Sequence, residues 1–376
     1  MKILVTSDLH LGERIWKHRP LSGDSYYAWH QIVKIAIKQD VDLVILAGDI
    51  LDKQMNTSGP VSYLIRGLHM LYDKGIPVWF TQGQHEMQSD PWAAISDTAE
   101  HINEQAHELE GVTFVGRDFC DAEKLTEFCS GELARSADVL VMHQVWLEFM
   151  GEECKPQGSF ELIPANVKLL ITGDYHENIC QDYNVNGRKL TVLSPGSTHL
   201  RSIAEPPDKY VFIVEFEEGK EKPKISTHPL LSRQVLNITA DDFEKLPKKI
   251  QAFLDEVEAY VADNNIPDSV AMPLVRITYN KDDSEAISKV EQKFAKKAHL
   301  FFKVVKTHNP EDAEPQLLHY MDSEDRVSML GALDNYVDKA KQPEVYSLAA
   351  KMLSSDEPTM SLMSWLKEQT NEIEQG

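Results

Sequence analysis

The first half of the 376-residue sequence predicts an α/β fold, and three observations carry this prediction. Short apolar runs that are typical of strands alternate with segments of helical apolar periodicity up to about residue 178. Beyond that point strand-like runs follow one another closely, and the turn dipeptide Asn186-Gly187 separates two of them as in a hairpin. The apolar content of 42% and the aromatic content of 8% are those of an ordinary globular protein, so the chain can bury a large core.

The expected elements of the first domain follow in chain order. The strands predicted in the first half are residues 2–7, 42–47, 77–82, 112–115, 138–143 and 167–172. Helical apolar periodicity between these strands predicts helices at 26–39 and 61–74. The closely spaced strands predicted after residue 178 are 179–185, 189–193, 209–215 and 223–228.

A second, smaller α+β unit is predicted at residues 233–307, so the first domain is expected to span residues 1–232. The expected elements of the second unit are a helix at 241–263, a strand at 273–279, a helix at 284–298 and a strand at 300–306. A linker with two prolines is predicted at 308–320. In the tail, residues 321–376, apolar residues recur at steps of three and four, which predicts short amphipathic helices.

The composition excludes some classes of protein. The formal net charge of −22 argues against a surface that coats nucleic acid broadly, although it leaves room for a local basic track. No apolar run approaches the roughly 20 residues of a membrane span, and the N-terminus is not typical of a signal peptide. The four cysteines form no CxxC pair. We therefore expect a cytoplasmic protein with reduced thiols and no membrane partner.

Five of the predicted strands end in polar side chains that can bind metal. In chain order these residues are Asp8, His10, Asp49, Gln84, His85, His143, Asp174 and His176. Taken singly, each is typical of a turn or a hydrogen-bonded cap. Loops at the carboxyl ends of strands in an open α/β sheet converge on one crevice, so the ordered set predicts a shared metal site.

The donor set favours a particular chemistry. All of these residues except His85 are candidate ligands, and they offer seven oxygen or nitrogen donors and no thiolate. Seven donors exceed what one ion usually takes from a protein, and they suit two ions that share a carboxylate. Asp49 is the only acid at its strand end and is therefore the expected bridge. Two ions about 3.5–4 Å apart promote in-line phosphoryl displacement, and His85 is placed to protonate the leaving oxygen. The sequence thus predicts metal-dependent hydrolysis of a phosphoester.

These motifs resemble those of the calcineurin-like metallophosphoesterases, whose pattern is DxH, GD, GNH followed by Asp or Glu, a lone His, and GHxH. The corresponding segments here are "SDLHLG" at 7–12, "GD" at 48–49, "GQHE" at 83–86, His143 and "GDYH" at 173–176. "LSPGSTHLRS" at 193–202, "DKYVFIVEF" at 208–216 and "MPLVRITYN" at 272–280 are most similar to SbcD-type nuclease subunits of SbcCD complexes. The resemblance implies a four-layer β-sandwich flanked by helices, with a capping domain and a helical tail.

The resemblance also implies the metal ligands, for two Mn²⁺ ions or Mg²⁺ in their place. The first ion would take Asp8, His10, Asp49 and His176, and the second would take Asp49, Gln84, His143 and Asp174. His85 corresponds to the residue that protonates or stabilises the leaving group. Two ligands depart from the family pattern, since Gln84 stands in place of Asn and Asp174 in place of His. The carboxylate of Asp174 is a hard ligand that favours Mn²⁺ or Mg²⁺.

We expect a DNA nuclease, an exonuclease and endonuclease acting on DNA ends in repair, recombination or replication. The resemblance implies an SbcC-like ATPase partner bound by the C-terminal helices, and a homodimer. Two alternatives stay open: a phosphoesterase for small substrates, and a catalytically weakened subunit that binds DNA and its partner. The second domain and the tail favour the nuclease, because an enzyme for small substrates needs neither.

The candidate DNA contacts lie close to the metal ligands in the sequence. Arg14, Lys17 and Arg19 surround an aromatic residue shortly after His10, and such a segment can hold a phosphate backbone. A solvated loop is the alternative interpretation. Asp52, three residues after Asp49, occupies a position near the substrate where many family members have a different polar residue.

Overall fold

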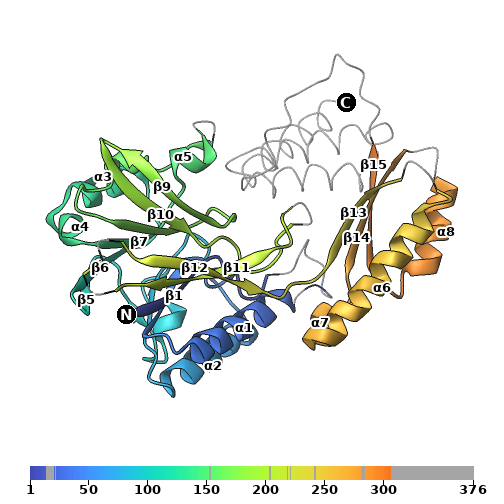
Figure 1. Ribbon diagram of the computed structural model, residues 1–376, viewed down its shortest axis with the longest axis horizontal. Coiled ribbons are helices and arrows are strands. Elements are labelled where there is room, and N and C mark those ends of the chain that lie inside the picture. Colours follow the sequence, from blue (N-terminus) through green and yellow to red (C-terminus); the bar gives the residue numbers. More distant parts are fainter. Residues whose placement is uncertain are drawn as a thin grey trace, which may run out of the picture. The chain divides into compact units, whose positions relative to one another are not determined.

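The computed structural model describes residues 1–13, 21, 23–151, 154–202, 205–217, 219–220, 222–240, 243–280 and 284–305. Figure 1 shows these parts of the chain as coloured ribbon. The predicted linker at 308–320 and the predicted helical tail at 321–376 lie outside the described residues, and so do Arg14, Lys17 and Arg19.

The first sheet has six strands. In spatial order they are β12 (Lys224–Leu230), β11 (Lys209–Glu215), β1 (Lys2–Thr6), β2 (Leu43–Ala47), β3 (Val78–Thr81) and β4 (Glu100–His101). Strands β1 to β4 run parallel, whereas β11 pairs antiparallel with β1 and β12 pairs antiparallel with β11. The carboxyl ends of β1, β2 and β3 therefore share one edge of the sheet.

The second sheet also has six strands. In spatial order they are β5 (Ala106–Leu109), β6 (Val112–Arg117), β7 (Val139–His143), β8 (Leu169–Gly173), β10 (Arg188–Ser194) and β9 (Ile179–Val185). Strands β6, β7, β8 and β10 are parallel. The hairpin β9–β10 turns at Asn186 (φ 50°) and Gly187 (φ 79°), both left-handed, as a type I′ turn requires. The predicted hairpin is thus confirmed.

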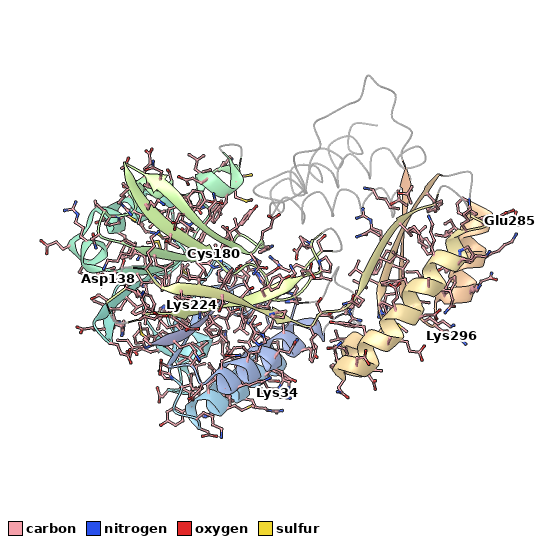
Figure 2. All side chains as sticks on the ribbon, viewed as in Figure 1. Lys34, Asp138, Cys180, Lys224, Glu285 and Lys296 are labelled. Carbon is pink, nitrogen blue, oxygen red and sulfur yellow. The ribbon has the colours of Figure 1, made fainter. Side chains whose placement is uncertain are left out.

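The two sheets pack face to face, and side chains fill the space between them (Figure 2). Alternation along each strand sends Ile3 and Val5 toward the second sheet and Leu4 toward the helices on the outer face. Helices α1 (Asp24–Gln39) and α2 (Ser58–Tyr72) cover the outer face of the first sheet. Helices α3 (Ala122–Ser130) and α4 (Glu132–Ser136) lie over the second sheet. These four layers confirm the predicted fold class.

Shorter elements complete the large domain. They are η3 (Trp92–Ala94), α5 (Leu147–Met150) and η5 (Phe160–Leu162). Among the described residues, no helix is long and apolar enough to span a membrane.

A smaller sheet follows, made of the parallel strands β13 (Val235–Thr239), β14 (Leu274–Asn280) and β15 (His299–Val305). Helices α6 (Leu246–Asn264) and α8 (Ser284–Phe294) pack on it through residues such as Ile250, Ile277 and Phe294, and α7 (Asp268–Ala271) precedes β14. Strand β13 was not predicted from the sequence, and α6 begins at Leu246 instead of the predicted residue 241.

A buried ion pair joins α1 to the segment that enters the small sheet. Arg233 is only 2% exposed, and its Nε and Nη2 donate to Asp24 Oδ1 at 2.9 Å and Oδ2 at 2.8 Å. The same guanidinium donates to the carbonyl oxygens of Ser269 and Met272, which flank the end of α7. One arginine thus fixes three chain segments.

Candidate metal centre

The strand ends that the sequence singles out carry unusual backbone conformations. Asp8 (φ 50°), His10 (φ 40°), Asp49 (φ 49°) and Asp174 (φ 80°) all adopt positive φ, which is uncommon outside glycine. Backbone hydrogen bonds hold the first two loops together, since Asp8 N–H donates to Gly48 O at 3.1 Å and His10 N–H to Asp49 O at 2.9 Å. Left-handed residues of this kind are strained and cluster at functional sites.

Two glycines allow these loops to approach closely. A Cβ at Gly48 would lie 2.3 Å from His143 Nδ1, and a Cβ at Gly83 would lie 2.0 Å from Asp49 Oδ1. Both separations are below any van der Waals contact. The glycines that precede Asp49 and Gln84 are therefore required by the packing of the site.

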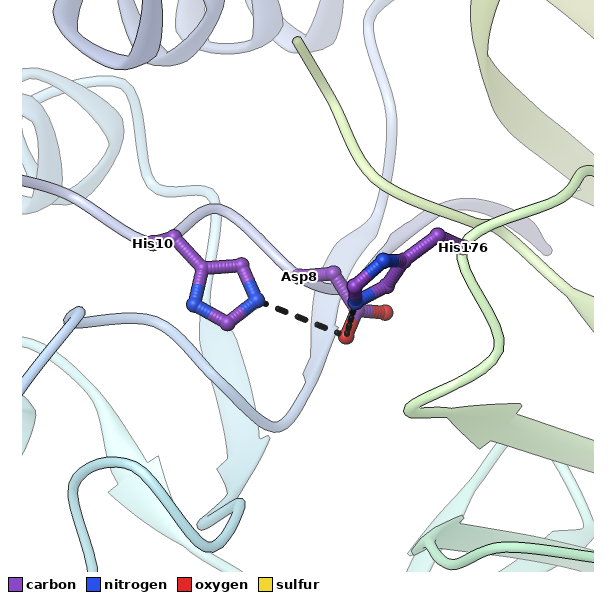
Figure 3. A group of neighbouring side chains, drawn as sticks. All are labelled: Asp8, His10 and His176. Carbon is purple, nitrogen blue, oxygen red and sulfur yellow. Dashed lines mark ion pairs between the residues drawn. The ribbon is translucent and has the colours of Figure 1, made fainter. Parts of the chain in front are cut away.

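Asp8, His10 and His176 form the first of the groups of side chains that could hold a metal ion (Figure 3). Both imidazoles approach the same carboxylate oxygen, with Nε2 of His10 3.9 Å and Nε2 of His176 3.8 Å from Asp8 Oδ1. Asp8 and His10 are completely buried, whereas His176 is 27% exposed. The first predicted ion thus has a candidate set of ligands within reach of one another.

Asp49 lies between that group and the remaining candidates. Its Oδ2 is 3.5 Å from His10 Nε2 and 3.3 Å from His143 Nε2. His143 Nε2 is in turn 3.7 Å from Asp174 Oδ1, which also accepts a hydrogen bond from Gln84 Nε2. One carboxylate therefore faces both sets of ligands, as a bridging ligand must.

The residues present fit divalent metal. Among the described residues, buried atoms without a hydrogen-bond partner include both ring nitrogens of His10, Nε2 of His143 and Oε1 of Gln84. His143 Nδ1 lies 2.8 Å from the carbonyl oxygen of Ala47, so Nδ1 carries a proton and Nε2 is the nitrogen that faces Asp49 and could bind a metal. A buried polar atom without a partner costs about 1–3 kcal/mol, and coordination removes that cost. Carboxylate, amide and imidazole donors of this kind suit a divalent metal ion.

Burial and neighbouring charges set the ionisation of the site. Burial raises the pKa of Asp49, but the close approach of His143 lowers it more, and the result is about 2. Burial and the nearby charge of Arg201 bring the pKa of His10 well below its ordinary value. Asp49 is thus an anion and His10 a neutral imidazole, which are the protonation states that metal ligands need.

His85 lies at the edge of the cluster, 23% exposed. Its backbone N–H donates to Asp49 Oδ1 at 3.2 Å, and its Nδ1 lies 3.1 Å from the carbonyl oxygen of Asp52. Nε2 is thereby left to face the site, 3.8 Å from Asp49 Oδ2. The Asp52 carboxylate joins His10 and His85 in a further group, and burial, followed by the charge of Glu13, raises its pKa to about 6.

Several charged residues near the site were not predicted from the sequence. Glu86 accepts hydrogen bonds from the backbone N–H groups of Leu51 and Gly83 and so ties the second strand-end loop to the third. Burial and the negative charge of Asp49 raise the pKa of Glu86 to about 8. The acid that follows His85 in the "GQHE" motif was the only available signal for this role.

Arg201 is a further charged residue near the site that was not predicted from the sequence. Burial lowers its pKa, but the carboxylates of Glu13, Asp49 and Glu205 outweigh burial, so that the pKa is raised. Its Nη1 lies 2.8 Å from His176 Nε2. Arg201 falls in the "LSPGSTHLRS" segment, which resembled the family without pointing to a role.

The structure brings together all eight side chains that the sequence proposed for the site, and it places Asp52 beside them. The family model of calcineurin-like phosphoesterases matches residues 1–178.

Three curated relatives bear names that concern DNA repair. The chain is 28% identical over 318 residues to the "DNA double-strand break repair protein Mre11" of Methanosarcina acetivorans, covering 81% of this chain and 50% of that protein. It is 27% identical over 338 residues to the protein of the same name from Methanosarcina mazei, covering 85% and 52%. The "Double-strand break repair protein MRE11" of Encephalitozoon cuniculi is 28% identical over 318 residues, covering 68% and 53%. The chain thus spans about half the length of the curated relatives it matches.

Proposed function

We propose that the chain is a metal-dependent nuclease that hydrolyses phosphodiester bonds at DNA ends in repair, recombination or replication, because the family model of calcineurin-like phosphoesterases matches residues 1–178. The observation that carries this proposal is the position of Asp49, whose carboxylate faces both groups of ligands across distances of 3.3 and 3.5 Å. The similarity to proteins named for double-strand break repair supports DNA as the substrate.

Two Mn²⁺ ions, with Mg²⁺ as a substitute, are the proposed cofactors. Asp8, His10 and His176 would hold the first, Gln84, His143 and Asp174 the second, and Asp49 would bridge them. When bound, such a metal pair supplies a nucleophile at neutral pH and neutralises charge on the phosphodiester. The chain itself fixes the ligand tautomers, as the contact of His143 Nδ1 with Ala47 O illustrates at 2.8 Å.

We assign His85 the role of general acid. Its Nδ1 contact with the carbonyl oxygen of Asp52 (3.1 Å) orients the ring, so that Nε2 points at the cluster from a partly exposed position. A proton on Nε2 can then pass to the leaving oxygen of the DNA strand. The partial exposure of His85 is consistent with access for a large substrate.

The proposed partners are an SbcC-like ATPase and a second copy of this chain. The apolar residues that recur at steps of three and four in residues 321–376 support amphipathic helices that dock on the ATPase. Deletion of residues 318–376 should therefore leave a chain that no longer co-purifies with the ATPase. For the homodimer we propose the surface of α1 and α2. On α2, Tyr72 is 62% and Tyr63 is 38% exposed, and aromatic side chains are enriched at interfaces.

The test compares DNA with a small substrate. The purified chain, loaded with Mn²⁺, is incubated with end-labelled duplex DNA and separately with bis-p-nitrophenyl phosphate. We expect release of nucleotides from DNA at a far higher kcat/KM than turnover of the small ester. The reverse preference would favour the phosphoesterase for small substrates. Bound Mn²⁺ without any hydrolysis would favour a subunit that only binds DNA and its partner.

A further inference from the structure

A layer of charged side chains lies beside the first group of metal ligands. Glu13 follows the first strand-end loop, and Arg201 and Glu205 come from the segment after β10. Arg201 Nε donates to both carboxylate oxygens of Glu13, at 3.1 and 3.0 Å. Glu205 accepts from the Arg201 backbone N–H at 3.3 Å and from Lys209 Nζ at 2.8 Å. The Glu13 carboxylate therefore holds the Arg201 guanidinium at its Nε atom.

The other side of the guanidinium contacts a proposed metal ligand. Arg201 Nη1 lies 2.8 Å from His176 Nε2, and a guanidinium can only donate. Nε2 must then be the acceptor, and the ring proton must be on Nδ1, where Glu205 Oε1 lies 3.7 Å away. This is the tautomer in which Nε2 can coordinate a metal.

The lone pair of His176 Nε2 cannot accept a hydrogen bond from Arg201 and bind a metal at the same time. His176 Nε2 is the nitrogen that faces Asp8 Oδ1, at 3.8 Å, so it is the atom that a metal in the first group would take. Coordination there requires Arg201 Nη1 to leave Nε2. If Glu13 keeps its contact with Nε, the planar guanidinium pivots as one unit and remains at the edge of the site.

The released donor is suited to a phosphate. The Arg201 side chain is 20% exposed, so a substrate could reach part of it. Charge-assisted hydrogen bonds from arginine to phosphate oxygens are among the stronger polar contacts in proteins. No described residue besides Arg201 places a guanidinium in contact with a proposed metal ligand.

We propose that Arg201 has two successive roles, occupying Nε2 of His176 until the metal binds and then donating to a non-bridging phosphate oxygen of the substrate. This inference rests on the proposed function, because it assumes that the first group binds metal. Arg201 is thereby a substrate-binding residue, and Glu13 is the positioning residue that anchors it.

The experiment separates this role from a merely structural one by the sign of the effect on metal affinity. The full chain carrying Arg201→Ala is titrated with Mn²⁺ alone by calorimetry. The Mn²⁺-loaded protein is then titrated with inorganic phosphate. We expect Mn²⁺ to bind about three- to tenfold more tightly, because a competing donor and a like charge have been removed. If Arg201 only supported His176, Arg201→Ala would instead bind Mn²⁺ more weakly than wild type.

Phosphate and DNA binding provide the second readout. In Arg201→Ala, phosphate should bind roughly 10- to 100-fold more weakly, and KM for duplex DNA should rise by a similar factor with a smaller change in kcat. Arg135→Ala, which removes an exposed arginine on α4, is the matched control and should change neither quantity. Weaker Mn²⁺ binding, or unchanged phosphate binding, would overturn the inference.

A second variant keeps the test decisive if Arg201→Ala does not fold. Glu13→Gln leaves Arg201 in place and removes the charged anchor, so phosphate should bind about threefold more weakly. Unchanged phosphate binding in a folded Glu13→Gln protein would also overturn the inference. Failure of the wild-type chain to bind Mn²⁺ or cleave DNA would instead refute the proposed function, so the two failures are distinguishable.

Discussion

Two of the buried clusters of charged side chains in the described part of the chain differ in how their polar atoms are satisfied. At the junction between α1 and the small sheet, Arg233 meets both oxygens of Asp24 and two backbone carbonyls. At the metal centre, buried atoms of His10, His143 and Gln84 have no hydrogen-bond partner among the described residues. Folding tolerates unsatisfied buried groups only at a cost, so the first cluster is satisfied within the protein, whereas the second keeps donor atoms that a bound ligand could satisfy.

Backbone conformation separates the two clusters in the same way. Asp8, His10, Asp49 and Asp174 are all left-handed, whereas Asp24 begins a regular helix. Positive φ values are strained and persist only where the surrounding structure enforces them. The two sheets must therefore hold the candidate metal ligands in place. Substitutions at the metal centre should therefore affect chemistry, and substitutions at the junction should affect stability.

The largest effect is expected for Asp49→Asn. Both Asp49 oxygens are in use, since Oδ1 accepts from the His85 N–H and Oδ2 faces three imidazoles. An amide offers one uncharged oxygen, so it cannot bridge two ions. We expect hydrolysis of DNA to fall to background and the Mn²⁺ content of the purified protein to drop. Asp73→Asn, on an exposed turn after α2, is the control. Near-normal activity of Asp49→Asn would contradict the two-metal assignment.

The next effect concerns His85, which separates metal binding from proton transfer. His85→Ala should retain its Mn²⁺ but cleave DNA about 10²- to 10⁴-fold more slowly, the usual contribution of a positioned acid. The rate is measured in single turnover, and metal content by mass spectrometry. His69→Ala, an exposed histidine of α2, should leave both unchanged. Loss of metal from the His85 variant would make His85 a ligand.

The third prediction addresses the satisfied cluster. Arg233→Met leaves the carboxylate of Asp24 buried without its partner, and breaking such a pair lowers the free energy of unfolding by about 3–5 kcal/mol. Adding Asp24→Leu should recover much of this loss, because two apolar side chains can replace a buried ion pair. Denaturant unfolding gives the stabilities, and Arg135→Met is the exposed control. A change in Mn²⁺ affinity without a change in stability would erase the distinction between the clusters.

The sequence predicted those parts of the fold whose signal is local. Buried parallel strands such as β2 and β8 are continuous apolar runs, and all five of their residues are buried. In strand β13 no residue is buried, and Asn237 and Thr239 are exposed. Its apolar pattern was therefore too weak to predict a strand. Helix α6 starts later than predicted because Pro247 lacks an N–H and fits only the first turn.

The same limit applies to the metal centre. Its candidate ligands could be proposed because each directly follows an apolar strand and carries a recognisable motif. Glu13 and Arg201 are 188 residues apart, and nothing in either segment indicates that they form an ion pair. The contact of Arg201 with His176 likewise depends on how the segment after β10 folds back, which no local pattern encodes.

The smallest effects are expected at the two positions that depart from the family pattern, and the structure adds that these positions contact each other. Gln84 Nε2 donates to Asp174 Oδ1, while Gln84 Oε1 has no partner among the described residues. The Gln84 amide thus contacts Asp174 through Nε2, and its Oε1 would be available to hold the proposed second ion. Gln84→Asn shortens the side chain by one methylene, and Asp174→His replaces a charged acceptor by an imidazole.

Each single change should be tolerated, with activity within about tenfold of wild type, since another oxygen or nitrogen donor remains in place. The double variant should be more active than the product of the two single effects, because contacting residues are coupled. Asp174→His should also reduce the ratio of Mg²⁺- to Mn²⁺-supported activity, because imidazole is a softer ligand than carboxylate. Rates measured with each metal in a double-mutant cycle provide the check. Strict additivity together with an unchanged metal preference would show that residue 174 does not contact the ion, and that the unpartnered oxygen of Gln84 has some other purpose.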